Sequence, residues 1–305
     1  MSSFFNPNST NRQPVVRLRR VYFWVLGLLM SSSIMAADIH HRYFYTSDGI
    51  RLHYLEAGTG EPSLLFIPGW LMPAAIFQSQ LQTLSATHRV VVLDPRSQGQ
   101  SDVYKGSHSA ALRARDIHEW VVHAHPQEFV LVGWSLGVME GLDYVHRYQP
   151  THLRGLVLID NSIGEGTPPP AKAHPAGPPV DHKIYLHQFV RSMFKTPQSE
   201  DLLATIDAST LKVSESIAAQ LLAKPYSRDY YRSTLLESHV PTLYAITPHL
   251  KYQGDALLVD DPSAQVIVYA HSGHALFVDE AERFNEDVAR FVGSLPQHSR
   301  QAAAQ

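Results

Sequence analysis

The feature that most limits what this chain can fold into is an apolar run that ends at a serine flanked by glycines. Phe129–Val132 is short and apolar, Gly133–Gly137 (GWSLG) follows it, and a helical pattern then extends to Tyr148. This is G-x-S-x-G between a strand and a helix, the setting in which a sharp turn raises a serine hydroxyl above the edge of a sheet. Side chains at either glycine would crowd such a turn. The pattern therefore predicts a nucleophile at Ser135.

Apolar strands alternate with amphipathic helices over most of the chain. Four runs are typical of strands buried on both faces: Ser63–Ile67, Val90–Leu93, Phe129–Val132 and Leu156–Ile159. This alternation predicts an α/β fold with a mostly parallel central sheet flanked by helices. Ligands bind at the carboxyl ends of such strands. Trp70, Ser135 and Asp160 each follow a predicted strand, so we expect them at one edge of the sheet.

A leader precedes the predicted fold. Residues 1–37 contain four arginines, the apolar run Val21–Met30 and the small residues of Ser31–Ala37, which is the layout of a secretory signal peptide. The alternative is an uncleaved N-terminal anchor, which would be the only attachment to a membrane. Either reading predicts a protein exported to the periplasm or secreted, or one held on the membrane by this segment.

A second segment interrupts the alternation of strands and helices. Prolines at 168–170 and 178–179 predict a stiff linker, and the pattern that follows is helical without buried strands. We interpret this segment as a helical cap over the strand ends. The predicted parts are a core of residues 38–162 and 240–296, a cap of residues 163–239 and a flexible tail of residues 297–305.

Composition excludes several classes of function. The 305 residues carry a net charge of −3, so nucleic acid is not an expected partner. The chain has no cysteine, which excludes disulfides, thiolate metal sites and a cysteine nucleophile. Neither a nucleotide-binding glycine loop nor an H-E-x-x-H sequence occurs. We expect no cofactor and no metal, and a small ester as the binding partner.

Four segments in order carry a resemblance to a known family: FIPGW (Phe66–Trp70), DPRSQGQS (Asp94–Ser101), GWSLG (Gly133–Gly137) and SGHALFVDEAERFN (Ser272–Asn285). The chain resembles the α/β-hydrolase family over about residues 42–162 and 240–295. The first and third segments are similar to small carboxylesterases, including the pimeloyl carrier-protein methyl ester esterases. The cap matches those esterases too poorly for their substrate to be carried over.

The resemblance implies roles for individual residues. Ser135 is the expected nucleophile and His274 the expected base, in the family's order along the chain. The family usually places its acid just after the strand that here ends at Ile246, yet the next residues, Thr247–Leu250, include no carboxylate. Asp160 is our preferred acid, because some lipases of this fold take it from that strand, and Asp255 is the alternative.

The remaining site residues concern the oxyanion and the substrate. Backbone N–H groups of Trp70 and Leu136 are the expected oxyanion hole. The family usually has a histidine where Pro68 stands, but a backbone donor does not require it. Trp134, Phe189 and Phe194 are candidates for the wall of an apolar substrate pocket. The alternative is that these three side chains only pack the core and the cap.

These residues together predict a serine hydrolase that cleaves a small or medium apolar carboxylic ester through an acyl-enzyme. One alternative keeps the triad and changes the reaction to carbon–carbon bond hydrolysis or cofactor-free perhydrolysis. Another is a non-catalytic ligand-binding protein on a hydrolase scaffold. Dehalogenase and epoxide hydrolase activities are disfavoured, because those relatives have aspartate where Ser135 stands.

Overall fold

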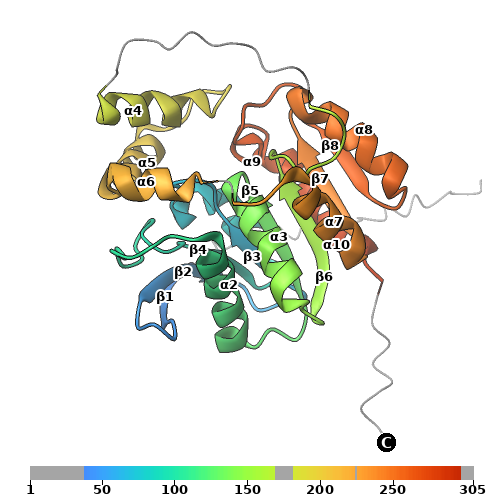
Figure 1. Cartoon of the computed structure of the whole chain (residues 1–305), viewed down its shortest axis with the longest axis horizontal. Helices are drawn as coiled ribbons and strands as arrows, with labels where there is room; N and C mark the ends of the chain where they lie inside the picture. The colour runs from blue at the N-terminus through green and yellow to red at the C-terminus, as the bar shows by residue number, and fades with distance from the viewer. Residues whose placement is uncertain (1–37, 169–180, 224, 297–305) are drawn as a thin grey trace, which may run out of the picture. The chain divides into compact units, whose positions relative to one another are not determined.

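The structure, a computed structural model, describes residues 38–168, 181–223 and 225–296 (Figure 1). Eight strands form one sheet in the order β1-β2-β4-β3-β5-β6-β7-β8. The strands are β1 (His40–Tyr45), β2 (Arg51–Ala57), β3 (Ser63–Ile67), β4 (Val90–Leu93), β5 (Phe129–Trp134), β6 (Leu153–Ile159), β7 (Thr242–Ile246) and β8 (Gln265–Val268). Strand β2 pairs antiparallel with β1 and β4, and all other neighbours are parallel. The predicted α/β fold with a mostly parallel sheet is confirmed.

All the described helices lie after β3 in the chain. They are η1 (Ala74–Phe77), α1 (Gln78–Leu84), α2 (Ala110–Ala124), α3 (Leu136–Tyr148), α4 (His182–Ser192), α5 (Glu200–Lys212), α6 (Glu215–Leu221), α7 (Arg228–Ser238), η2 (Pro248–Leu250), α8 (Lys251–Asp260), α9 (Leu276–Asp279) and α10 (Ala281–Ser294). Ser109 caps α2 by accepting a hydrogen bond from the backbone of Leu112, and Ser199 caps α5 in the same way. Such caps satisfy N–H groups that the helix itself leaves unpaired.

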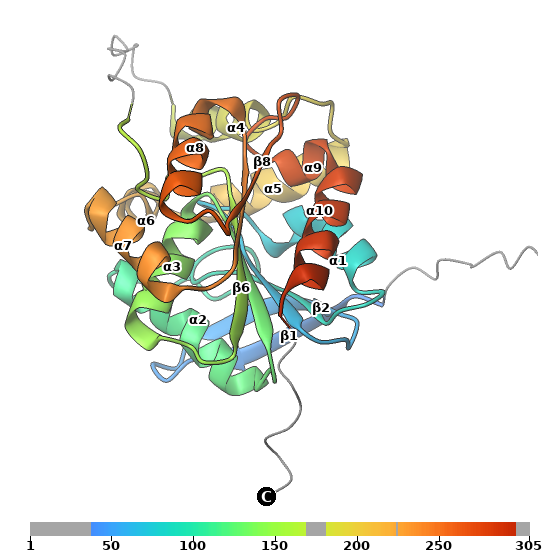
Figure 2. The same cartoon turned by 90° about the vertical axis from the view of Figure 1, so that its right-hand side faces the viewer.

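Side chains of the central strands alternate between two buried layers. In β3, Leu64 and Phe66 belong to the layer formed with α1 and α10, whereas Leu65 and Ile67 belong to the layer formed with α2 and α3. Figure 2 shows these two pairs of helices on opposite faces of the sheet. Burial on both faces explains why the strands read as continuous apolar runs in the sequence.

The helices between β6 and β7 do not form a single layer. Buried residues of α4, α5 and α6 join the layer of α1 and α10. These three helices also contact the loops after β3 and β4: Trp70 Nε1 donates to Ala218 O and Lys212 Nζ donates to Gly99 O, each at 2.9 Å. They therefore lie against loops that follow the carboxyl ends of two strands. Helix α7 packs against α3 instead, with Tyr231 in the opposite layer.

Several predictions concern residues outside the described part of the chain. The leader of residues 1–37, the tail of residues 297–305 and most of the proline-rich linker lie there. The division into a core of residues 38–162 and 240–296 and a cap of residues 163–239 stays a prediction. Within the described ranges, no helix is long and apolar enough to cross a membrane.

The turn after β5 leaves no room for a side chain at its second glycine. A Cβ added to Gly137 would lie 2.2 Å from Ile67 O, a backbone atom that cannot move aside. We expect Gly137→Ala to lower the free energy of unfolding by about 1–3 kcal/mol. Denaturant unfolding of the purified variant measures this change.

Gly293 provides the matched control. It lies exposed in α10, where an added Cβ meets no atom within 4 Å. Gly293→Ala should raise the free energy of unfolding by about 0.5–1 kcal/mol, because alanine loses less backbone entropy in a helix. Equal effects of the two substitutions would contradict the crowding at Gly137.

Candidate active site

Ser135 lies at the turn between β5 and α3 in a backbone conformation that residues other than glycine rarely adopt. Its φ is 54° and its ψ is −119°. The turn is held by backbone hydrogen bonds from Ser135 N to Ile159 O and from Val138 N to Ser135 O, both 3.0 Å long. Asn161 Nδ2 also donates to Ser135 O at 2.6 Å. A residue held in such a strained conformation by its surroundings is typical of functional sites.

The turn after β3 lies directly against Ser135. A Cβ added to Gly69 would be 3.0 Å from Ser135 Cβ. The N–H groups of the next residue, Trp70, and of Leu136 find no backbone or side-chain acceptor among the described residues. For Leu136 the reason is simple, because the first N–H groups of a helix have no partner within it. Two free donors thus come from segments that flank the serine.

His274 and Asp160 meet at the carboxyl ends of β8 and β6. His274 Nδ1 lies 2.8 Å from Asp160 Oδ2, and the carboxylate side chain is fully buried. The other oxygen, Oδ1, accepts hydrogen bonds of 2.7 Å from both the backbone N–H and the hydroxyl of Thr247. Both carboxylate oxygens are therefore satisfied, and His274 Nδ1 must carry its proton to donate to Asp160. His274 Nε2 is left as the basic nitrogen.

The charge state of Asp160 follows from these contacts. Burial acts to raise the pKa of its carboxyl, but hydrogen bonds from His274 and Thr247 outweigh burial and hold the pKa below its ordinary value of 3.8. Asp160 is consequently an anion at neutral pH. An anion beside Nδ1 stabilises the imidazolium that forms when a histidine accepts a proton.

Asp255, the alternative acid, is placed differently. It lies in α8 with its side chain 61% exposed and forms an ion pair with Lys251 on the same helix, at 2.6 Å. Such exposed pairs contribute about 0–1 kcal/mol to stability. The structure brings Asp160 and not Asp255 into hydrogen-bond contact with His274.

The loop that carries His274 is tied to both the core and the cap. Trp134 Nε1 donates to His274 O at 2.9 Å. From the cap side, Ala275 N donates to Met193 O at 3.0 Å. The carboxylate of Asp279 accepts from Gly273 N at 2.7 Å and from the backbone N–H groups of residues 195 and 196, each at 2.9 Å. The segment just after α4 and the histidine loop therefore hold one another in place.

The predicted pocket residues have different surroundings. Trp134 is only 1% exposed and packs edge to face on Phe277, so most of its surface serves the core. Trp70 contacts Phe189 edge to face, with ring centroids 5.2 Å apart. Phe189 and Phe194 are partly buried against the same core layer. The cap aromatics thus remain the candidates with surface left for a ligand.

Ser135 and His274 are not joined by a hydrogen bond in the part of the chain that the structure describes. The residue before Ser135 contacts the histidine: the centroid of the Trp134 ring lies 5.3 Å from that of His274. In unliganded enzymes catalytic hydrogen bonds are often long and tighten only with substrate. The serine and histidine roles therefore stay predictions.

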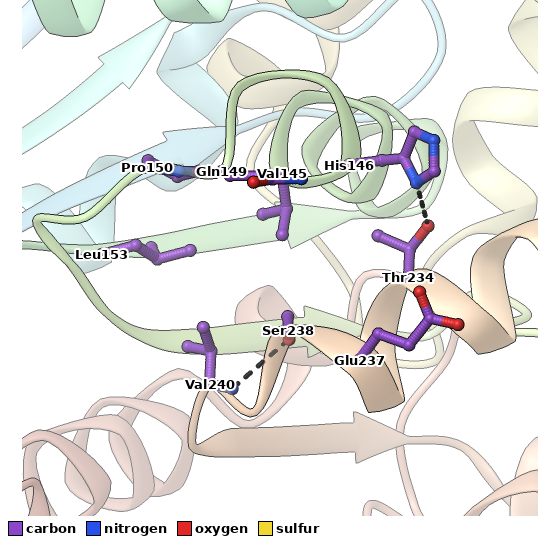
Figure 3. A pocket seen from close by; sticks show the side chains of 9 residues that line it. All are labelled: Val145, His146, Gln149, Pro150, Leu153, Thr234, Glu237, Ser238 and Val240. Atoms are coloured by element: carbon purple, nitrogen blue, oxygen red, sulfur yellow. Dashed lines mark hydrogen bonds between the residues drawn. The ribbon is translucent and has the colours of Figure 1, made fainter.

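Among the described residues, no group of three or more His, Asp or Glu side chains is arranged to hold a metal ion. A cavity of about 410 Å³ lies elsewhere in the fold. Its lining includes Val145, Pro150, Leu153 and Val240, whose side chains are drawn in Figure 3. These residues lie near the amino ends of β6 and β7, and none of the predicted site residues lines the cavity.

Two polar residues at the site were not predicted from the sequence. Asn161 contacts the carbonyl of Ser135, and Thr247 contacts Asp160. Thr247 directly follows β7, and Asn161 is the second residue after β6. Ser135 and Asp160 likewise lie just past strand ends. A search for polar side chains just past strand ends would have found them.

A family model described as the alpha/beta hydrolase fold matches residues 62–281. The chain belongs to this family. An AB hydrolase superfamily protein of Bacillus subtilis is 21% identical to it, over 83% of this chain and 99% of the relative. A pimeloyl-acyl-carrier-protein methyl ester esterase of Yersinia enterocolitica is 22% identical, over 79% of this chain and 97% of the relative.

Solved structures agree with this assignment. A proposed aryl esterase from Burkholderia cenocepacia superposes with a TM-score of 0.70 at 25% identity, over 83% of this chain and 98% of that protein. The esterase RhEst1 of Rhodococcus superposes with a TM-score of 0.69 at 19% identity, over 84% and 99% of the two chains. Hydrolase and esterase relatives support an enzyme of the α/β-hydrolase family.

The low pKa of Asp160 predicts how stability depends on pH. A carboxylate whose folded pKa is lowered stabilises the fold above its unfolded-state pKa of about 4, and this contribution declines as pH falls through the folded pKa. The difference in free energy of unfolding between wild type and Asp160→Asn should therefore be greatest at neutral pH and shrink below about pH 4. Denaturant unfolding at pH 7, 5 and 3.5 measures it.

Asp255→Asn is the control for this series. Its carboxylate is exposed and paired only with Lys251. We expect its unfolding free energy to stay within about 1 kcal/mol of wild type at every pH. A constant gap between wild type and Asp160→Asn from pH 7 to 3.5 would contradict the assigned ionisation.

Proposed function

We propose that this protein is a serine hydrolase that cleaves a small or medium apolar carboxylic ester. The observation that carries the proposal is the hydrogen bond between His274 Nδ1 and the buried carboxylate of Asp160, beside a strained turn at Ser135. Base and acid come from the ends of two different strands, as a triad on this fold requires. The names of the esterase relatives support the same chemistry.

The proposed reaction begins with attack of Ser135 Oγ on the ester carbonyl. His274 Nε2 takes the hydroxyl proton as the new C–O bond forms, and Asp160 stabilises the resulting imidazolium. The N–H groups of Trp70 and Leu136 donate to the oxyanion. When the tetrahedral intermediate collapses, His274 returns the proton to the leaving alkoxide and an acyl-enzyme remains. Water then attacks with His274 again as base, which releases the acid and restores Ser135.

The aromatic side chains of the cap favour a substrate with an apolar acyl group over one with a charged acyl group. Trp70 and Phe189 form an aromatic pair between the oxyanion turn and α4. Phe194 follows the same helix and is partly buried against the core. Aromatic side chains of this kind bind apolar groups mainly through the area that they bury.

The direct test is hydrolysis of p-nitrophenyl esters of graded acyl length by wild type and three variants. We expect Ser135→Ala to lower kcat by at least 10⁴-fold and Asp160→Asn by about 10³- to 10⁴-fold, because both act in one unit. Asp255→Asn should retain wild-type kcat, since its side chain is exposed and bound to Lys251. Circular dichroism checks that each variant is folded.

Two outcomes would overturn the proposal. Full activity in Ser135→Ala would remove the serine from the mechanism. A folded wild type that neither cleaves any ester nor reacts with an organophosphonate would favour a binding protein on a hydrolase scaffold.

A further inference from the structure

Thr247 is a neutral residue just after β7, where the family usually has the acid of its triad. It follows β7 directly, is 6% exposed, and directs both its N–H and its hydroxyl at one oxygen of Asp160. The same carboxylate uses its other oxygen for His274. Thr247 therefore touches the acid on the side away from the base.

The sheet explains why these two residues meet. Strands β6 and β7 are parallel neighbours, and Ile159 pairs with Ala245 in their register. Asp160 continues this pairing, since its N–H donates to Ala245 O at 2.9 Å. The residues just past the two strand ends consequently lie side by side, and Thr247 is the one that reaches the carboxylate.

The direction of the Thr247 hydroxyl bond follows from counting protons. Thr247 Oγ1 lies 2.7 Å from Asp160 Oδ1 and 2.6 Å from His249 Nδ1, but it has a single hydrogen to donate. A charged acceptor forms the stronger hydrogen bond. The hydroxyl therefore donates to Asp160 and accepts from His249, whose Nδ1 carries the proton.

We propose that Thr247 is a positioning residue for the reaction, whose hydroxyl, oriented by His249, fixes the Asp160 carboxylate so that its other oxygen stays on His274. This inference rests on the proposed hydrolase function. Without the hydroxyl, Oδ1 of Asp160 would keep a single donor, the backbone N–H of Thr247, and two donors at this oxygen restrain rotation of the carboxylate more than one does. Catalytic groups need this degree of positioning, because small misplacements cost large factors in rate.

The test compares Thr247→Val, which keeps the shape and removes the hydroxyl, with Thr247→Ser, which keeps the hydroxyl. Both variants retain the backbone N–H. We expect Thr247→Val to lower kcat about tenfold with KM within twofold, because a hydrogen bond to a charged group is lost. Thr247→Ser should keep kcat within about twofold of wild type. Wild-type kcat in a folded Thr247→Val variant would overturn the proposal.

His249→Ala tests the direction of the hydroxyl. His249 is exposed, and its removal leaves the donor to Asp160 in place. We expect a smaller loss of kcat than in Thr247→Val. Wild-type or higher kcat would overturn the assigned direction, because a hydroxyl that donates to His249 in the wild type would be freed by this variant to donate to Asp160.

A second readout needs no substrate. Proton NMR follows the His274 Nδ1 proton, which His274 donates to the buried carboxylate of Asp160. Its downfield signal should be sharp in wild type and Thr247→Ser, and broadened or lost in Thr247→Val. Identical signals in all three proteins would overturn the positioning role. Absence of esterase activity in wild type would instead overturn the proposed function. The NMR comparison would still test whether the Thr247 hydroxyl positions the Asp160 carboxylate.

Discussion

The site depends on the close approach of two backbones. The carbonyl of Ile67 at the end of β3 lies where a side chain on Gly137 would begin, and Gly69 lies against Ser135 in the same way. This contact brings the loop after β3 to the start of α3. The N–H groups of Trp70 and Leu136 flank the serine as a consequence. A parallel sheet makes the contact possible, because β3 and β5 are neighbours and end at the same edge.

Asp160, the proposed acid, follows a different strand from the one after which the family usually has its acid, and the sheet places the two strand ends side by side. Strand β6, which ends before Asp160, is adjacent to β7, which ends before Thr247. A carboxylate that follows β6 instead of β7 therefore still reaches the loop that carries His274. The fold tolerates the complete burial of the Asp160 carboxylate, because hydrogen-bond donors satisfy both of its oxygens.

The sequence predicts the sheet well because each central strand is apolar on both faces. The run at Val90–Leu93 coincides with β4, and the glycines around Ser135 identify the turn. The contact between Asp160 and His274 joins residues 114 positions apart, so no local pattern can choose Asp160 over Asp255. Likewise, α7 reads as one more cap helix in the sequence, and only packing assigns it to α3. Local sequence patterns predict the strands and helices, whereas only tertiary contacts bring Asp160 to His274.

The bonds between the segment after α4 and the histidine loop bear on how the protein admits a ligand. Ala275 N, next to His274 in the chain, donates to Met193 O, and the Asp279 carboxylate accepts from Gly273 N and from the backbone N–H groups of residues 195 and 196. Lifting this end of the cap would break bonds that orient His274. A movement of the cap that keeps these bonds intact would therefore leave the segment just after α4 in place.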